Sequence, residues 1–387
     1  MIQRSKVVRY QFSMASRKPK QPVKQVNPLV AEFLQSCKTQ QFNDQDLITY
    51  ITNQLEKSET VFRLCQVSIL PSYGKSLLRL FQKYQRLSQI IFYACPIQDP
   101  TFTKQLAAEF AKNSANVLQL DYCPIDRDTI TPLLSAQTLD VLSLRGNQCL
   151  TPYNFVTHAP GPFTSSLNSF FTALATSTLK VLNLFGCHIG DTGTIALANC
   201  LVLNTSLRCL CLSNNRIGDP GAFALADALS SRLLTEQEAL IVDRFVNEES
   251  KQKISDEGGG LLKKGKKGSK GASKKAPAKP TSKKGQQVKQ PQERPMNFDP
   301  EAPVNVVILS KWQSCITDDV GNKILPGNST ITSLLLKDND ITLSGATALK
   351  NMLQTNTKIV CFDIDGNPEI EPEMIQAMKR ECPPETS

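Results

Sequence analysis

The chain has 387 residues, a formal net charge of +9 and 40% hydrophobic residues, which is enough apolar material for a large core. It contains no apolar run of about 18–20 residues, so we expect no membrane span. The segment from Met1 to Lys24 lacks the apolar block of a signal peptide, and we therefore interpret the twelve cysteines as reduced thiols of an intracellular protein.

The positive charge is concentrated in two segments. Met1–Lys24 carries seven Lys and Arg and no acid, and Ser250–Arg294 carries fourteen Lys and Arg against three acids. The rest of the chain is therefore mildly acidic. This separation predicts a folded part with basic extensions that are attracted to acidic partners.

The chain begins with a basic tail and a helical cap. Residues 1–27 predict a flexible tail. Asn27 followed by Pro28 is typical of a helix start, because Asn caps free backbone N–H groups and Pro is tolerated in the first turn. Apolar residues at helical spacing predict two helices within residues 28–58. A repeat array needs such a cap, since an open end would expose its core.

Residues 59–230 are repetitive. The leucines of the segment from Leu179 to Leu184 return 28 residues later between Leu207 and Leu212. The template L-x-x-L-x-L-x-x-(N/C)-x-(I/L) resembles the leucine-rich repeat, in which each unit is a short strand followed by a helix. It predicts an α/β fold, a horseshoe-shaped solenoid with parallel strands on the concave face and helices on the convex face. The expected repeat starts are Glu59, Leu87, Ala115, Leu139, Leu179, Leu207, Pro303, Ile331 and Ile359.

Two insertions interrupt the repeats. The Pro- and Gly-rich residues 151–166 lengthen one unit. Residues 231–302 separate the first block of repeats from a second block at 303–378, which is followed by a tail at 379–387. Within the second insertion Leu233–Lys251 is helix-like, whereas the Lys-, Gly- and Ser-rich part has almost no apolar surface and predicts disorder.

The Lys-rich part of this insertion is a candidate basic contact segment. Three interpretations stay open: a solvated linker, an electrostatic contact with an acidic surface such as tubulin, anionic lipid or nucleic acid, and a nuclear localisation signal. Base stacking is disfavoured because no aromatic residues are interleaved. The lysines of the segment are Lys263, Lys264, Lys266, Lys267, Lys270, Lys274, Lys275, Lys283 and Lys284.

Position nine of each repeat carries a compact polar side chain. We expect it to hydrogen-bond to the backbone of the turn that leaves the strand. Cys replaces Asn in some units because it is small and a weak donor. Val67 and Lys311 depart from the pattern, so their units are the least regular. The matching residues are Cys95, Cys123, Asn147, Cys187, Asn215, Asn339 and Asn367.

Positions three and five of the strand, with positions seven and eight after it, are expected on the concave face. Their side chains are largely apolar or aromatic, which is typical of a protein-binding surface. Two interpretations stay open, a protein partner on this face or coverage by the chain's own insertion or tail. The residues predicted to contact a partner are Tyr93, Val117, Tyr122, Val141, Arg145, Val181, Phe185, Cys209, Cys211, Leu335, Lys337 and Cys361.

Catalytic motifs are incomplete. Ile359–Asn367 resembles the Asp-x-Asp-Gly motif of haloacid-dehalogenase-like phosphatases, in which Asp363 would be the nucleophile and Asp365 the acid/base. That motif normally opens a domain, however, and the repeat template also accounts for the pattern. Gly74-Lys75-Ser76 lacks the first glycine of a phosphate-binding loop. Zinc-binding spacings of Cys and His are also missing, so we expect no metal, no cofactor and no enzymatic activity.

The 28-residue unit and its G-x-x-x-L-x-x-x-L segment resemble the ribonuclease-inhibitor-type repeats. An array that is broken late by a long Lys- and Gly-rich insertion, together with the segment from Asn204 to Leu229, resembles the leucine-rich repeat-containing protein 71 family. This resemblance implies a non-catalytic scaffold of the axoneme in cilia and flagella, within the cytoplasm and cytoskeleton. Its implied partners are axonemal proteins and tubulin, without a small-molecule substrate. Two alternatives stay open: a cytosolic inhibitor or GTPase-regulator-like protein, and a nuclear protein tethered by its Lys-rich segment.

Overall fold

The computed structural model describes residues 27–110, 114–125, 130–148, 150, 164–236, 239–240, 242–243 and 315–382. Several sequence predictions lie outside these residues. They are the basic tail at 1–26, the Pro- and Gly-rich insertion at 151–163, the lysines of the basic contact segment and the C-terminal end at 383–387.

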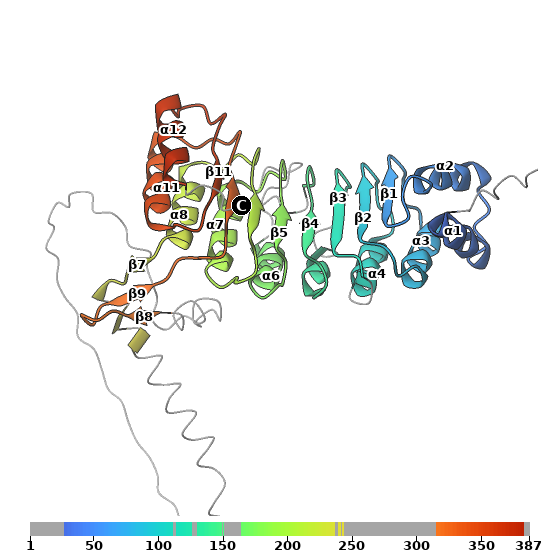
Figure 1. Ribbon diagram of the computed structural model, residues 1–387, viewed down its shortest axis with the longest axis horizontal. Helices are drawn as coiled ribbons and strands as arrows, with labels where there is room; N and C mark the ends of the chain where they lie inside the picture. The colour runs from blue at the N-terminus through green and yellow to red at the C-terminus, as the bar shows by residue number, and fades with distance from the viewer. Residues whose placement is uncertain are drawn as a thin grey trace, which may run out of the picture.

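Eight parallel strands form one sheet, to which each repeat contributes one strand (Figure 1). Neighbouring strands pair in register, so equivalent template positions lie side by side, as Val117, Val141 and Val181 do. The predicted α/β solenoid is thereby confirmed. In sheet order the strands are β1 (Val61–Cys65), β2 (Gln89–Tyr93), β3 (Val117–Asp121), β4 (Val141–Ser143), β5 (Val181–Asn183), β6 (Cys209–Cys211), β10 (Ser333–Leu335) and β11 (Cys361–Asp363).

Helices follow the strands and line one side of the array (Figure 1). In the described part of the short unit that starts at Ala115, a five-residue 3-10 helix stands before the next strand. None of the described helices is long and apolar enough to cross a membrane. The helices of the array are α3 (Pro71–Lys83), α4 (Pro100–Phe110), η1 (Thr131–Ser135), α6 (Thr164–Ala175), α7 (Gly190–Leu201), α8 (Asp219–Leu229), α11 (Leu343–Thr355) and α12 (Pro372–Glu381).

Two further helices, α1 (Pro28–Thr39) and α2 (Gln45–Leu55), stand at the N-terminal end of the sheet, where the sequence predicts them. The Leu29 N–H donates to Oδ1 of Asn27 at 2.9 Å, and Nδ2 of Asn27 donates to the Leu55 carbonyl at 3.0 Å. One side chain therefore starts the first helix and ties it to the end of the second. Phe33 and Ile51 are fully buried and belong to the same hydrophobic core as the strand residues.

Template positions four and six point into this core. Leu182 and Leu184 are fully buried, and the equivalent residues of the other strands are buried as well. Burial of one such leucine contributes about 1.5–3 kcal/mol to folding. Because successive side chains of a strand alternate between its faces, positions three and five point away from the core. A slip of one residue would exchange the two sets, so the leucines determine the register.

Position nine forms a hydrogen-bonded ladder between repeats, as predicted. Nδ2 of Asn339 donates to the carbonyls of Leu336 at 2.8 Å and Leu212 at 3.1 Å. Its Oδ1 accepts from the N–H groups of Asn215 at 2.8 Å and Ile217 at 3.1 Å. The position-nine cysteines reach carbonyls of the preceding strand through Sγ in the same way. Structure therefore accounts for these cysteines without any chemistry.

The helices also cap one another across repeats, which the sequence patterns did not indicate. Oδ1 of Asp219, at the start of α8, accepts from the N–H groups of Thr342 at 2.9 Å and Gly345 at 3.0 Å. Asp191 makes equivalent contacts from α7 to the start of α8. Each carboxylate thereby satisfies N–H groups that have no partner within their own helix.

The prediction that a repeat starts at Pro303 is wrong. Strand β6 pairs directly with β10, with Cys209 opposite Ser333, so no strand of a Pro303 unit lies between them. Counting 28 residues back from Ile331 leads to Pro303. In the sheet, however, the repeat that stands before Ile331 is the one that begins at Leu207, ahead of the insertion. Leu207 and Ile331 are 124 residues apart, which is 96 more than one repeat.

The chain therefore leaves the array and returns to it within one loop, between α8 and β10, and the insertion lies in this loop. The Asn328 N–H donates to the Ala228 carbonyl at 2.9 Å. One repeat earlier, the Asn204 N–H donates to the Cys200 carbonyl at 3.1 Å in the same way. The hydrogen bond that ends the helix of a regular unit is thus formed across the insertion, and the second block of repeats resumes only after it.

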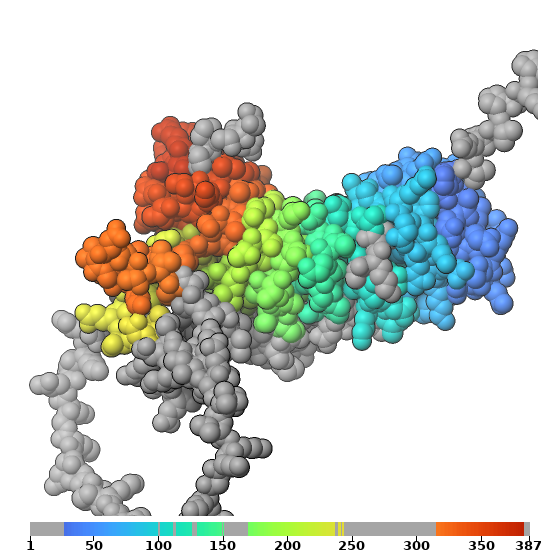
Figure 2. All heavy atoms as spheres, turned by 60° about the horizontal axis from the view of Figure 1, so that its bottom comes forward, coloured from blue at the N-terminus to red at the C-terminus, as the bar shows by residue number. Residues whose placement is uncertain are grey.

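The ends of the insertion form a small antiparallel sheet beside the array, shown in yellow and orange in Figure 2. Its order is β7 (Arg232–Leu233), β9 (Lys323–Leu325) and β8 (Ile316–Thr317). The helix expected from Leu233 to Lys251 is wrong at its start, because Leu233 pairs with Ile324 as a strand residue. A helical hydrogen bond from the Ala239 N–H to the Thr235 carbonyl follows at 2.8 Å, and residues 244–251 lie outside the described part.

Candidate protein-binding face

The concave face, which is the side of the eight-stranded sheet away from the core, is built of parallel rows of side chains. Strand pairing aligns position three of each repeat in one row and position five in a second. The predicted contact residues in these rows are half-buried, so the strands support them while part of each side chain stays open to solvent. They are Val117, Val141, Val181, Cys209 and Cys361 in the first row, and Cys211 and Leu335 in the second.

A third row lies just past the strand ends, at position seven. Residue eight of every described repeat has a positive φ, between 51° and 77°. The N–H group of residue eight donates a hydrogen bond to the next repeat. For example, the Tyr122 N–H donates to the Arg145 carbonyl at 2.7 Å, and the Gly146 N–H donates to the Phe185 carbonyl at 2.8 Å. The bonds hold position seven of successive repeats in line. Its predicted contact residues are Tyr93, Arg145, Phe185 and Lys337.

Aromatic rings and one guanidinium meet at positions seven and eight of neighbouring repeats. The ring centroids of Tyr93 and Tyr122 are 5.5 Å apart in a T-shaped arrangement. Cζ of Arg145 lies 5.7 Å from the Tyr122 ring centroid and 4.4 Å from that of Phe185. Nε of Arg145 also donates to the Tyr122 hydroxyl at 3.2 Å. We call these four residues the aromatic–arginine cluster. Because Tyr93 and Tyr122 remain 44% and 39% exposed, the cluster offers both apolar area and a cation to solvent.

Gly146 permits this packing. Its φ of +70° is strained for other residues, and a Cβ at this position would overlap the Tyr122 ring. The sequence patterns did not single out Gly146. The available signal was the return of glycine at position eight in two further repeats, as Gly186 and Gly366.

Asp121 lies in the position-seven row and was not among the predicted contact residues. The Ser143 hydroxyl donates to its Oδ1 at 2.5 Å. Burial raises the pKa of the Asp121 carboxyl above its ordinary value, while the hydrogen bond from Ser143 and the N–H and charge of Arg145 oppose the rise. The surroundings of this carboxyl therefore disfavour a freely solvated negative charge.

Thiols line the rows toward the C-terminal end of the face. Burial raises the pKa of the Cys209 thiol, and a hydrogen bond with Ser333 opposes the rise. A neutral thiol behaves as a small apolar side chain, which agrees with the interpretation of Cys209 and Cys211 as apolar surface. Lys337 is exposed in the position-seven row, one repeat before its last described member, Asp365.

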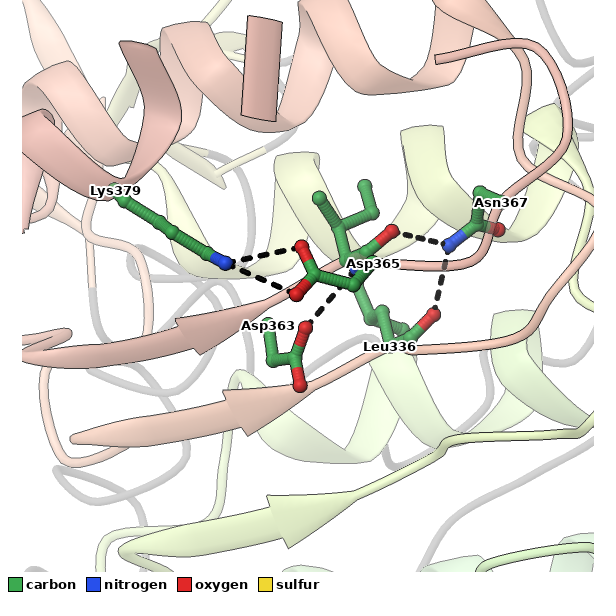
Figure 3. Close-up of polar contacts among 6 residues, drawn as sticks. Leu336, Asp363, Asp365, Asn367 and Lys379 are labelled. Carbon is green, nitrogen blue, oxygen red and sulfur yellow. Dashed lines mark hydrogen bonds and ion pairs between the residues drawn. The ribbon is translucent and has the colours of Figure 1, made fainter. Parts of the chain in front are cut away.

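The polar side chains of the Asp-x-Asp-Gly segment form hydrogen bonds and an ion pair within the repeat array (Figure 3). Nζ of Lys379, from α12, lies 3.0 Å from both carboxylate oxygens of Asp365. Oδ1 of Asp363 accepts from the Asp365 N–H at 3.0 Å, and Nδ2 of Asn367 donates to the Leu336 carbonyl at 3.1 Å. Within the described residues, no group of three or more His, Cys, Asp or Glu side chains is placed to hold a metal ion. The repeat template accounts for this segment, and the absence of enzymatic activity stays a prediction.

Comparison with known proteins agrees with the architecture. A family model described as Leucine Rich repeat matches residues 176–198, 203–226 and 327–350. The third match begins at Gly327, the point at which the chain returns to the array after the insertion. No curated protein matches the chain.

Proposed function

We propose that this leucine-rich repeat protein is a non-catalytic scaffold that binds a protein partner on its concave face. The observation that carries the proposal is the aromatic–arginine cluster. Tyrosine and arginine are among the side chains that contribute most of the binding energy at protein interfaces. Here they are exposed on a rigid sheet, next to half-buried apolar rows that supply further area to remove from water. A repeat array suits this role because it presents an extended surface.

We further propose that the scaffold belongs to the axoneme of cilia or flagella. The support is the resemblance of the broken repeat array to the leucine-rich repeat-containing protein 71 family. The site of the insertion is compatible with this role. Since the chain leaves and returns at the single loop between α8 and β10, the sheet pairing is uninterrupted. The Lys-rich segment would then add an electrostatic contact with acidic microtubule surfaces, without occupying a strand of the concave face.

A matched pair of triple variants tests the binding face. Val181→Glu, Phe185→Glu and Leu335→Glu together place three charges on the concave face. Ile195→Glu, Phe223→Glu and Leu343→Glu place three charges on α7, α8 and α11 in the same part of the array, where these residues are 41%, 45% and 51% exposed. Cross-linking in ciliated cells followed by mass spectrometry should show that the concave variant loses partners and that the helix variant keeps them. Equal retention by both variants contradicts the proposal.

Extraction of axonemes tests the proposed location. We expect a tagged protein to stay with detergent-extracted axonemes in salt of about 0.6 M, which screens surface charge. Packed apolar surface resists this treatment, whereas a contact through the Lys-rich segment alone is released by it. A protein that is absent from axonemes before salt is added would contradict the axonemal role and leave the binding face to be tested separately.

A further inference from the structure

The guanidinium of Arg145 is fixed in place before any partner binds. It lies against the Phe185 ring, with Cζ 4.4 Å from the ring centroid, and its Nε donates to the Tyr122 hydroxyl. Backbone hydrogen bonds of position eight join the three segments, since the Tyr122 N–H donates to the Arg145 carbonyl and the Gly146 N–H donates to the Phe185 carbonyl. Part of the rotamer freedom that an arginine ordinarily loses on binding is therefore already lost on folding, which lowers the entropic cost of recognition.

The charge of this cation acts on Asp121, but none of the described acids lies within salt-bridge distance of it. In the part of the chain that the structure describes, Arg145 forms no salt bridge, whereas Lys180 pairs with Asp140 at 2.8 Å and Lys379 pairs with Asp365 at 3.0 Å. The acid beside it, Asp121, is bonded to Ser143 instead. Nε is engaged by Tyr122, whereas the two terminal nitrogens of Arg145 form no hydrogen bond with a described residue, and their paired N–H groups match the geometry of a carboxylate.

We infer that the aromatic–arginine cluster recognises an Asp or Glu side chain of a partner protein, with an apolar side chain beside it. The carboxylate oxygens accept from the terminal N–H groups of Arg145. The apolar neighbour packs on the exposed rings of Tyr93 and Tyr122, which shield the ion pair from water. This inference rests on the proposed function, because it names what the concave face binds.

The surrounding charges favour a single carboxylate over a polyanion. Asp121 lies in the same row, and Asp365 lies at its C-terminal end, where Lys337 is the neighbouring exposed cation; Asp363 lies beside them in the position-five row. Nucleic acid requires a continuous basic track along its phosphates, together with stacking rings. The charged residues of the position-seven row are Asp121, Arg145, Lys337 and Asp365, so the row offers no continuous basic track and matches an isolated acidic side chain in a peptide segment.

The test is binding of the full-length protein to an array of short synthetic peptides of random sequence. Their C-termini are amidated, so that only side chains carry carboxylates. We expect the bound peptides to share an Asp or Glu next to an apolar residue. Exchange of that acid for its amide, or Arg145→Gln in the protein, should weaken binding about tenfold or more. The two changes together should add little, because each one removes the same interaction.

Two further variants separate geometry from net charge. Arg145→Lys keeps the charge but not the paired N–H groups, and we expect an intermediate loss of affinity. Lys337→Gln removes one charge from the same row, away from the rings, and should change the affinity less than about twofold. Circular dichroism melting curves check that every variant is folded.

The inference is overturned if the bound peptides share no acid, if Arg145→Gln leaves their affinity unchanged, or if Lys337→Gln weakens binding equally. Binding of a single-stranded oligonucleotide that depends on Arg145 also overturns it. Cross-linking separates this inference from the proposed function. If the concave triple variant loses its partners and Arg145→Gln keeps them, the scaffold stands and the carboxylate site is wrong. If neither variant loses partners, both are wrong.

Discussion

Asn339→Leu tests whether the position-nine ladder joins the two blocks of repeats. Asn339 is 4% exposed and forms four hydrogen bonds of 2.8–3.1 Å to backbone groups, with a fifth, longer one of 3.4 Å to the Lys337 carbonyl. Three of these groups belong to the repeat that precedes the insertion. Leucine has a similar volume but can neither donate nor accept. At about 1 kcal/mol for each of the four shorter hydrogen bonds, the substitution should lower the free energy of unfolding by about 4 kcal/mol.

Urea denaturation followed by far-ultraviolet circular dichroism measures the total loss. Because a repeat array does not always unfold in one step, hydrogen exchange is needed to locate it. The amides of Asn215 and Ile217 donate to Oδ1 of Asn339, so they should exchange faster in the variant. Asn351→Leu, at an exposed position of α11 in the same repeat, is the control, and we expect a change within about 0.5 kcal/mol.

The reasoning is refuted if Asn339→Leu behaves like the Asn351→Leu control. A small loss of stability with unchanged exchange at Asn215 and Ile217 would mean that packing of the leucines alone joins the two blocks. The side-chain ladder would then be a consequence of the fold and not one of its causes.

Three other predictions follow from the structure. Gly146→Ala should lower the melting temperature more than Gly321→Ala. Both glycines have a positive φ, at which alanine costs about 1–2 kcal/mol, but only a Cβ at position 146 overlaps a ring. Burial raises the pKa of Asp219 and the hydrogen bonds at the start of α11 outweigh this, so its folded pKa lies below the ordinary 3.8. Asp219→Asn should therefore cost about 1 kcal/mol at neutral pH, and urea titrations should show the difference disappearing as pH falls from 3.8 through the lowered pKa. Removal of Arg232–Gly327, which joins Ser231 to Asn328 and restores the 28-residue spacing, should leave a folded array by circular dichroism; loss of the fold would contradict the split-repeat assignment.

The local sequence pattern was sufficient to predict the strands, the helices and many residues of the concave face. The spacing of leucines determined the strands, their buried sides and the parallel register, because a period of 28 residues places equivalent side chains next to each other. Asn27 and Pro28 marked the start of the cap for a reason that acts within one helical turn. The same register placed the position-three, position-five and position-seven residues on the concave face, although their role in binding stays a prediction.

Tertiary structure alone decided which segments complete a repeat and how the side chains of the face combine. Counting residues placed a unit at Pro303, but pairing of β6 with β10 shows that Leu207–Ser231 is completed by residues on the far side of the insertion. A periodic count cannot detect this, since strand pairing depends on contact in space and not on distance along the chain. The meeting of Arg145 with Tyr122 and Phe185 likewise depends on a left-handed backbone at position eight, which only the folded array enforces at residues other than glycine.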